Sequence, residues 1–230
     1  MTSKRIIALI LILLLGLLTA IFLQHQLASS SHSLVSIQFS LSATSTPSAQ
    51  VQPPQPQATA TATAQTILDP ISGGKSRITK KPFGLYVSPG DSPISPEKFT
   101  GYHTGVDFET YPSEQNIDVP ISAVCSGRLL LKKWATGYGG VAVQSCSLSG
   151  QAVTVIYGHL NVDSITPKVG AVLVAGDFLA NLGQGYSEQT DGERKHLHLG
   201  IHKGTVISIL GYVPQQSQLS AWLDPQPFLK

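Results

Sequence analysis

A long uncharged stretch near the N-terminus is the feature that most constrains how this chain can fold. Lys4 and Arg5 are followed by uncharged sequence from Ile6 to Leu68, and every further charged residue lies from Asp69 onward. Charged residues make up about a quarter of a typical soluble domain. We therefore expect the N-terminal part to lie outside the globular domain that the rest of the chain forms.

The first part of this stretch is continuously apolar. Residues 6–23 read IIALILILLLGLLTAIFL, and only Gly16 and Thr19 interrupt the large hydrophobic side chains. As a helix the run would be about 27 Å long, close to the roughly 30 Å of a bilayer's hydrocarbon core. A buried helix of a soluble domain would show a polar face and caps, and this run shows neither. It predicts that residues 1–23 are an N-terminal signal anchor, a transmembrane helix that crosses the membrane through residues 6–23.

The flanking charges predict how this anchor is oriented. Lys4 and Arg5 precede it, and no further Lys or Arg follows until Lys75, so the positive-inside rule places the N-terminus in the cytoplasm. We expect a single-pass protein of the inner or cytoplasmic membrane with an extracytoplasmic C-terminal part. The Ala-Ser-Ser segment at 28–30 offers a cleavage site that would release a secreted protein. An uncleaved anchor is favoured, because signal peptides usually have a shorter apolar region of roughly 7 to 15 residues.

Residues 24–66 are rich in Ser, Thr, Gln, Pro and Ala. They include VQPPQPQ at 51–57 and ATATATA at 58–64. Such a composition cannot bury a hydrophobic core, and its prolines favour the polyproline II conformation. We expect a disordered linker that lets the C-terminal domain work at a distance from the membrane.

Short runs of β-type residues, separated by Gly and Pro turns, begin at about residue 67. The strand candidates are 121–134, 141–146 and 151–160, which form a predicted three-stranded meander, and 171–176, 177–182 and 196–202. Residues 67–230 therefore predict one mainly β domain, large enough for its own core. Lys4 and Arg5 account for the whole formal net charge of +2. The domain itself is formally neutral and offers no basic stripe for a nucleic acid.

Cys125 and Cys146 lie on two neighbouring candidate strands. In an oxidising extracytoplasmic compartment, a bridge between them would close a loop of about twenty residues and stabilise the domain by roughly 3 kcal/mol. The alternative is that both are small buried apolar side chains. Predicted export favours the intramolecular disulfide. Their spacing does not match the CxxC pairs of zinc or redox sites.

Three segments of the domain carry histidines in a context that indicates chemistry. In GYHTGVDF, His103 and Asp107 would lie about 13 Å apart on a straight strand, too far to share an ion, and Gly105 allows a bend. In KHLHLGIH, strict alternation puts His196 and His198 on one face and apolar residues on the other. In VIYGHL, His159 ends a predicted strand.

Two imidazoles and one carboxylate form a set that suits zinc. Such a set leaves a fourth tetrahedral position open, as catalytic rather than structural zinc sites do. The chain has no HExxH helix motif, which excludes a thermolysin-like arrangement. His202 shares the face of His198 but lies about 13 Å beyond it on a strand, so we expect it at a groove rim rather than on the metal.

The order HTGVD, YGHL, HLH resembles the lysostaphin/LytM-type zinc endopeptidases (metallopeptidase family 23), and the resemblance extends from about Lys81 to Lys230. This family cleaves peptide cross-links or bridges in bacterial peptidoglycan. The resemblance implies a small antiparallel β-sheet or barrel-like groove, of the duplicated-hybrid-motif kind, that receives an extended wall peptide. It implies one Zn²⁺ per domain on His103, Asp107 and His198, whereas His159 and His196 would assist the water and stabilise charge on the scissile carbonyl.

Two loops depart from the family pattern, ISPEKFTGY at 94–102 and SEQTDGERK at 187–195. Both would line the groove, so they bear on peptide specificity. A tyrosine often supports the oxyanion in this family, and Tyr86 and Tyr102 are the candidates here.

Two alternatives to a peptidoglycan hydrolase remain. Relatives that have lost metal ligands act as catalytically inactive regulators or peptidoglycan-binding modules, but here every histidine and aspartate position of the motifs is intact. A small-molecule carrier with a structural zinc is the other alternative, and a saturated metal sphere would favour it.

Overall fold

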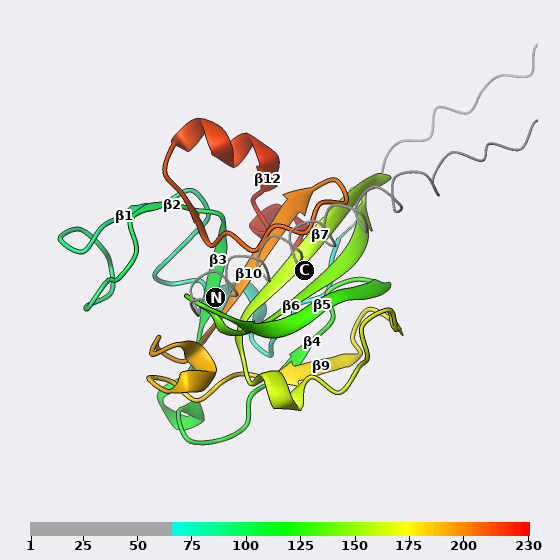
Figure 1. The fold of residues 1–230 in the computed structure, drawn as a ribbon, viewed down its shortest axis with the longest axis horizontal. Helices are drawn as coiled ribbons and strands as arrows, with labels where there is room; N and C mark the ends of the chain where they lie inside the picture. The colour runs from blue at the N-terminus through cyan, green and yellow to red at the C-terminus, as the bar shows by residue number, and fades with distance from the viewer. Residues whose placement is uncertain (1–65) are drawn as a thin grey trace, which may run out of the picture. The chain divides into compact units, whose positions relative to one another are not determined.

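The computed structural model describes residues 66–230 (Figure 1). The predicted anchor at 1–23 and the predicted linker, apart from Thr66, lie outside the described residues. Among residues 66–230, no helix has the length and apolar character needed to cross a bilayer.

The described part is built on an antiparallel sheet whose strands follow the order β12-β10-β7-β6-β5-β8, and β3 also pairs with β10, on the same edge of β10 as β12 (Figure 1). Its strands are β3 (Gly105–Glu109), β5 (Gly127–Ala135), β6 (Gly139–Leu148), β7 (Gln151–Leu160), β8 (Val172–Leu173), β10 (His196–Lys203) and β12 (Trp222–Leu223). The predicted mainly β, antiparallel fold is therefore confirmed for this part of the chain.

Two small sheets and six short 3₁₀ helices complete the described part. The small sheets join β1 (Tyr86–Val87), β2 (Gly101–His103) and β11 (Tyr212–Val213), and β4 (Pro120–Ser122) with β9 (Phe178–Asn181). The helices are η1 (Gly74–Arg77), η2 (Pro112–Glu114), η3 (Val162–Ser164), η4 (Glu188–Thr190), η5 (Gln216–Ala221) and η6 (Gln226–Phe228).

The predicted meander exists as β5, β6 and β7, but the candidate strand 121–134 is divided between β4 and β5. The division occurs because the backbone at 123–126 bonds elsewhere. The Ala123 amide donates to the Asp177 carbonyl over 2.9 Å, and the Val124 amide donates to the Tyr157 hydroxyl over 2.9 Å. The candidate strand 171–176 is shortened to the two residues of β8, because the chain enters a turn soon after Leu173.

The two faces of the sheet pack against different clusters. Leu197, Leu199 and Ile201 of β10 point into the main hydrophobic core. A smaller cluster on the opposite face includes Tyr138 and Trp222. The alternation therefore leaves the histidines of β10 on the face of the smaller cluster, as the sequence predicts.

A disulfide joins Cys125 to Cys146, whose Cα atoms are 6.1 Å apart. This confirms the bridged interpretation of the two cysteines. The first and last described segments are also joined, because Ile67 forms a parallel bridge with Leu229 and its amide donates to the Phe228 carbonyl over 2.8 Å.

Candidate metal and catalytic site

The register between β3 and β10 places His198 directly opposite Asp107. His103 ends β2, and the chain turns through Thr104 into β3, so His103 and Asp107 face the same place from two strands. Gly105 has a role here, but not as a flexible bend, because its φ is not positive. A Cβ atom at Gly105 would overlap the carbonyl oxygen of Leu199. The glycine permits a close approach of β3 to β10.

Three donor atoms converge at this place. His103 Nε2 lies 2.9 Å from His198 Nδ1 and 3.2 Å from Asp107 Oδ1, and His198 Nδ1 lies 3.3 Å from Asp107 Oδ1. Tetrahedral ligands with metal–ligand bonds of about 2.0 Å are separated by about 3.3 Å. All three side chains are buried, and they form the candidate metal-binding group among residues 66–230. The geometry therefore fits a single small cation.

The protonation states of this group also suit a metal. Nδ1 of His103 lies 3.1 Å from the Pro82 carbonyl; because a carbonyl only accepts, this nitrogen carries a proton, which leaves Nε2 as the atom that faces the other two donors. Burial lowers the pKa of His198 to about 4, so its imidazole is neutral. Burial alone would raise the pKa of Asp107, but His196 and His103 hold it well below its usual range. Neutral imidazoles and an ionised carboxylate are the forms that bind metals.

His196 and His159 lie beside the three donor atoms rather than among them. His196 Nδ1 donates to the Arg194 carbonyl over 2.8 Å, and its Nε2 lies 3.3 Å from Asp107 Oδ2. His159 ends β7 with a left-handed φ of 63°, and its ring centroid is 4.2 Å from that of His196. Burial, reinforced by the nearby His196, lowers the pKa of His159 well below its usual value. The two rings pack against each other at an interplanar angle of 35° next to the donor group.

The structure replaces both sequence candidates for the supporting tyrosine. Tyr86 is 44% exposed and packs edge-on against Tyr102 at 5.0 Å, and neither lines the site cavity. Tyr138 and Tyr212 line it instead. Tyr138 lies in the turn between β5 and β6.

The two tyrosines differ in how their hydroxyls are bound. The Tyr138 ring packs 5.4 Å from His159 and 5.5 Å from His198, and its buried hydroxyl has no hydrogen-bond partner among the described residues. The Tyr212 hydroxyl accepts a hydrogen bond from Lys81 Nζ over 2.8 Å, and its ring lies 5.2 Å from that of His103. The lysine leaves the Tyr212 hydroxyl proton available to another acceptor.

A cavity of about 220 Å³ opens beside these side chains. Its lining includes Asp107, His159, His196, His198, Phe99, Tyr138, Ile209 and Tyr212. His202 is not part of it, because its ring packs edge-on against Trp222 at 4.8 Å. The expectation that His202 lies at the groove rim is wrong, since its ring packs against Trp222 of β12, which pairs with this end of β10.

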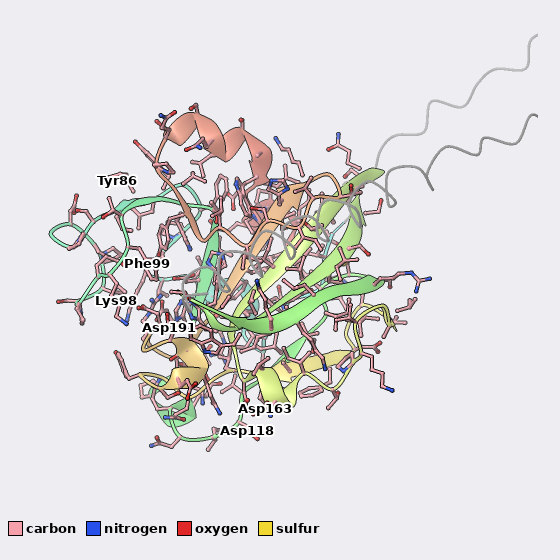
Figure 2. All side chains as sticks on the ribbon, viewed as in Figure 1. Tyr86, Lys98, Phe99, Asp118, Asp163 and Asp191 are labelled. Carbon is pink, nitrogen blue, oxygen red and sulfur yellow. A yellow bond between two sulfur atoms is a disulfide. The ribbon has the colours of Figure 1, made fainter. Side chains whose placement is uncertain are left out.

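The two loops that depart from the family pattern meet at the cavity. Phe99 of the first loop and Arg194 of the second both line it. Lys98 Nζ donates to the Asp191 carbonyl over 3.3 Å and pairs with Glu193 at 3.2 Å. Figure 2 shows Lys98, Phe99 and Asp191 on the same side of the molecule. Sequence reasoning identified these loops but not Arg194 itself.

Comparisons with known proteins give one family match and several similar solved structures. The chain matches the model of Peptidase family M23 over residues 101–208. Solved structures to which it is similar include LytU, with 27% identity over 66% of this chain and 83% of that chain and a TM-score of 0.46. The catalytic domain of lysostaphin from Staphylococcus simulans is 24% identical, over 66% of this chain and 92% of that chain, with a TM-score of 0.46.

A zinc containing peptidase from Vibrio cholerae has 20% identity, covers 60% of this chain and 37% of that chain, and gives a TM-score of 0.39. A comparison with curated proteins gave no match. The family match begins at β2 and ends beyond β10, so it includes His103, Asp107, His159, His196 and His198. Residues 101–208, which carry the site, therefore belong to peptidase family M23.

Proposed function

We propose that this protein is a zinc-dependent endopeptidase that hydrolyses peptide cross-links or bridges of bacterial peptidoglycan. The observation that carries the proposal is the convergence of His103 Nε2, Asp107 Oδ1 and His198 Nδ1 within 2.9–3.3 Å of one another. Membership of family M23 supports the reaction class, and the adjoining cavity supports a peptide as the ligand.

His103, Asp107 and His198 would hold the zinc ion. Two nitrogen donors and one oxygen donor suit zinc better than calcium or magnesium, which prefer oxygen ligands. When bound, zinc would polarise the scissile carbonyl and lower the pKa of a coordinated water. Among residues 66–230 the metal-binding group has three donor residues and adjoins a cavity, an arrangement that favours a catalytic site over the saturated sphere of a structural one.

The other polar groups of the cavity have roles that follow from their positions. His159, which burial keeps neutral, would accept a proton from the attacking water. His196 packs against it, and one of these two imidazoles would pass that proton to the leaving amine. Tyr138 and Tyr212 line the same cavity, and their hydroxyls would donate hydrogen bonds to the carbonyl oxygen as negative charge develops there.

A catalytically inactive regulator or peptidoglycan-binding module of the same fold is the alternative function. The convergent donor atoms favour the enzyme, because a module that only binds peptides does not require them. We also propose that residues 1–23 anchor the protein in the cytoplasmic membrane and that the linker at 24–66 carries the domain at 67–230 on the extracytoplasmic side. The uncharged sequence from Ile6 to Leu68 and the preceding Lys4 and Arg5 support this arrangement.

The test uses the full-length chain with zinc on purified peptidoglycan sacculi, with the released fragments identified by mass spectrometry. We expect His103→Ala to lose both zinc and hydrolysis. His202→Ala is the matched control, because it removes an imidazole from the same domain but outside the cavity. Chelation should abolish wild-type activity, and added zinc should restore it. Hydrolysis by zinc-free His103→Ala at the wild-type rate would reject the proposal.

A further inference from the structure

Arg194 contacts Asp107 at the edge of the candidate metal site. It lies two residues before β10, and only 9% of it is exposed. Its Nη2 atom donates to Asp107 Oδ2 over 2.8 Å. The guanidinium therefore contacts the carboxylate oxygen that does not face His103 and His198.

The two oxygens of the Asp107 carboxylate have different neighbours. Oδ1 lies 3.2 Å from His103 Nε2 and 3.3 Å from His198 Nδ1, whereas Oδ2 is engaged by Arg194 and lies 3.3 Å from His196 Nε2. A carboxylate without such a partner is free to rotate and to offer both oxygens to a cation. We infer that Arg194 is a positioning residue that holds Asp107 as a ligand through Oδ1 alone. This inference rests on the proposed zinc site.

Arg194 is itself held in place by Glu109. Nε of Arg194 donates to both Glu109 oxygens over 3.0 and 3.1 Å, and Nη2 donates to Glu109 Oε1 over 2.6 Å. Asp107 and Glu109 are two residues apart on β3, so they lie on the same face of the strand. One guanidinium therefore spans both carboxylates, and its planar fork fixes the geometry in a way that an ammonium would not.

Charge and positioning predict opposite effects on the metal. A cationic side chain close to Zn²⁺ repels it, so charge alone predicts that removing Arg194 tightens zinc binding. Positioning predicts the reverse, because loss of an outer hydrogen-bond partner of a ligand typically weakens metal affinity about 10- to 100-fold. The sign of the change therefore distinguishes the two effects.

The experiment measures the zinc affinity of the full-length chain by competition with a chromophoric chelator. We expect Arg194→Met to bind zinc about 10- to 100-fold more weakly than wild type. Arg128→Met is the control, because the Arg128 side chain is exposed and its only hydrogen bond among the described residues is to the Gly170 carbonyl, at 2.8 Å. Unchanged or tighter binding by folded Arg194→Met would overturn the inference. Wild-type protein that binds no zinc would instead reject the proposed function.

Arg194→Lys separates geometry from charge and decides the question should Arg194→Met fail to fold. Lysine keeps the charge but replaces the fork with a point donor, so charge alone predicts no change, whereas positioning predicts weaker zinc binding. The visible spectrum of the Co²⁺-loaded proteins gives a second measurement. We expect the variant's absorption to weaken, because a carboxylate that binds through both oxygens raises the coordination number. A Lys variant with wild-type affinity and spectrum would contradict the inference.

Discussion

His198 on β10 stands opposite Asp107 on β3, and this single cross-strand pair brings His198 Nδ1 to 3.3 Å from Asp107 Oδ1. The pair joins two segments that are ninety-one residues apart in sequence. A shift of β3 by one residue would turn the Asp107 side chain to the other face of the sheet. The candidate site therefore depends on strand register as much as on the identity of the ligands.

Gly105→Ala should disturb this register. The added Cβ would overlap the Leu199 carbonyl oxygen, so β3 must move away from β10. We expect a loss of about 1–3 kcal/mol in the free energy of unfolding together with weaker zinc binding. Thermal unfolding and chelator competition would measure the two effects. Gly90→Ala is the control, because nothing lies within 4 Å of a Cβ built at Gly90. Equal effects of the two substitutions would contradict the argument.

Tyr138→Phe should separate activity from stability. The Tyr138 hydroxyl is buried and has no partner among the described residues, so removing it breaks no hydrogen bond and should leave the melting temperature unchanged or higher. If this hydroxyl stabilises the scissile carbonyl, kcat should fall about 100- to 1,000-fold while zinc stays bound. Tyr102→Phe, outside the cavity, should retain full activity. An active Tyr138→Phe enzyme would exclude this role for Tyr138.

The Arg77–Glu114 pair predicts how stability responds to acid. Two hydrogen bonds of 2.7 Å from Arg77 hold the pKa of Glu114 below its usual value. A lowered folded-state pKa means that the stabilisation is complete above the ordinary glutamate pKa and is lost as pH falls through the folded-state value. The difference in melting temperature between wild type and Glu114→Gln should therefore shrink on acidification. The exposed Glu188 provides the control substitution, Glu188→Gln, which should show no such trend.

Reduction of the Cys125–Cys146 disulfide should lower stability without removing a metal ligand. The bridge closes a loop with a sequence separation of 21, and such a loop is worth roughly 3 kcal/mol. Denaturant unfolding of the Cys125→Ala/Cys146→Ala variant would measure this loss. Thiol titration offers an independent check, with no thiols in the native protein and two after reduction and unfolding. A wild-type titration of two thiols before reduction would contradict the structure.

The alternation of apolar and polar residues predicted part of the site correctly. His196 and His198 share one face of β10, and the leucines between and after them enter the main core. Periodicity works here because β10 is a central strand buried on both faces, where a side chain's face is fixed by its position along the strand. The context of the motifs, rather than periodicity, singled out His103, Asp107 and His159, and the resemblance supplied their roles.

Residues that reach the cavity from loops and short strands were not predictable in this way. No periodicity in the sequence indicates where the side chains of Tyr138, Arg194 and Tyr212 point. Each is placed by contacts with distant segments, as Lys81 places Tyr212 across a sequence separation of 131. For His202, the alternation predicted the correct face of β10. It did not predict that Trp222 of β12 packs against the His202 ring at that end of the strand.

The bridge between Ile67 and Leu229 has a mechanical consequence. A pull applied to the chain on the N-terminal side of Ile67 is borne first by two hydrogen bonds, from the Ile67 amide to the Phe228 carbonyl and from the Leu68 amide to the Val124 carbonyl. Val124 is followed by Cys125, so the load passes into the disulfide and the strand β6. Because these contacts lie nearest to the applied force, they would be strained before β3, the strand that carries Asp107.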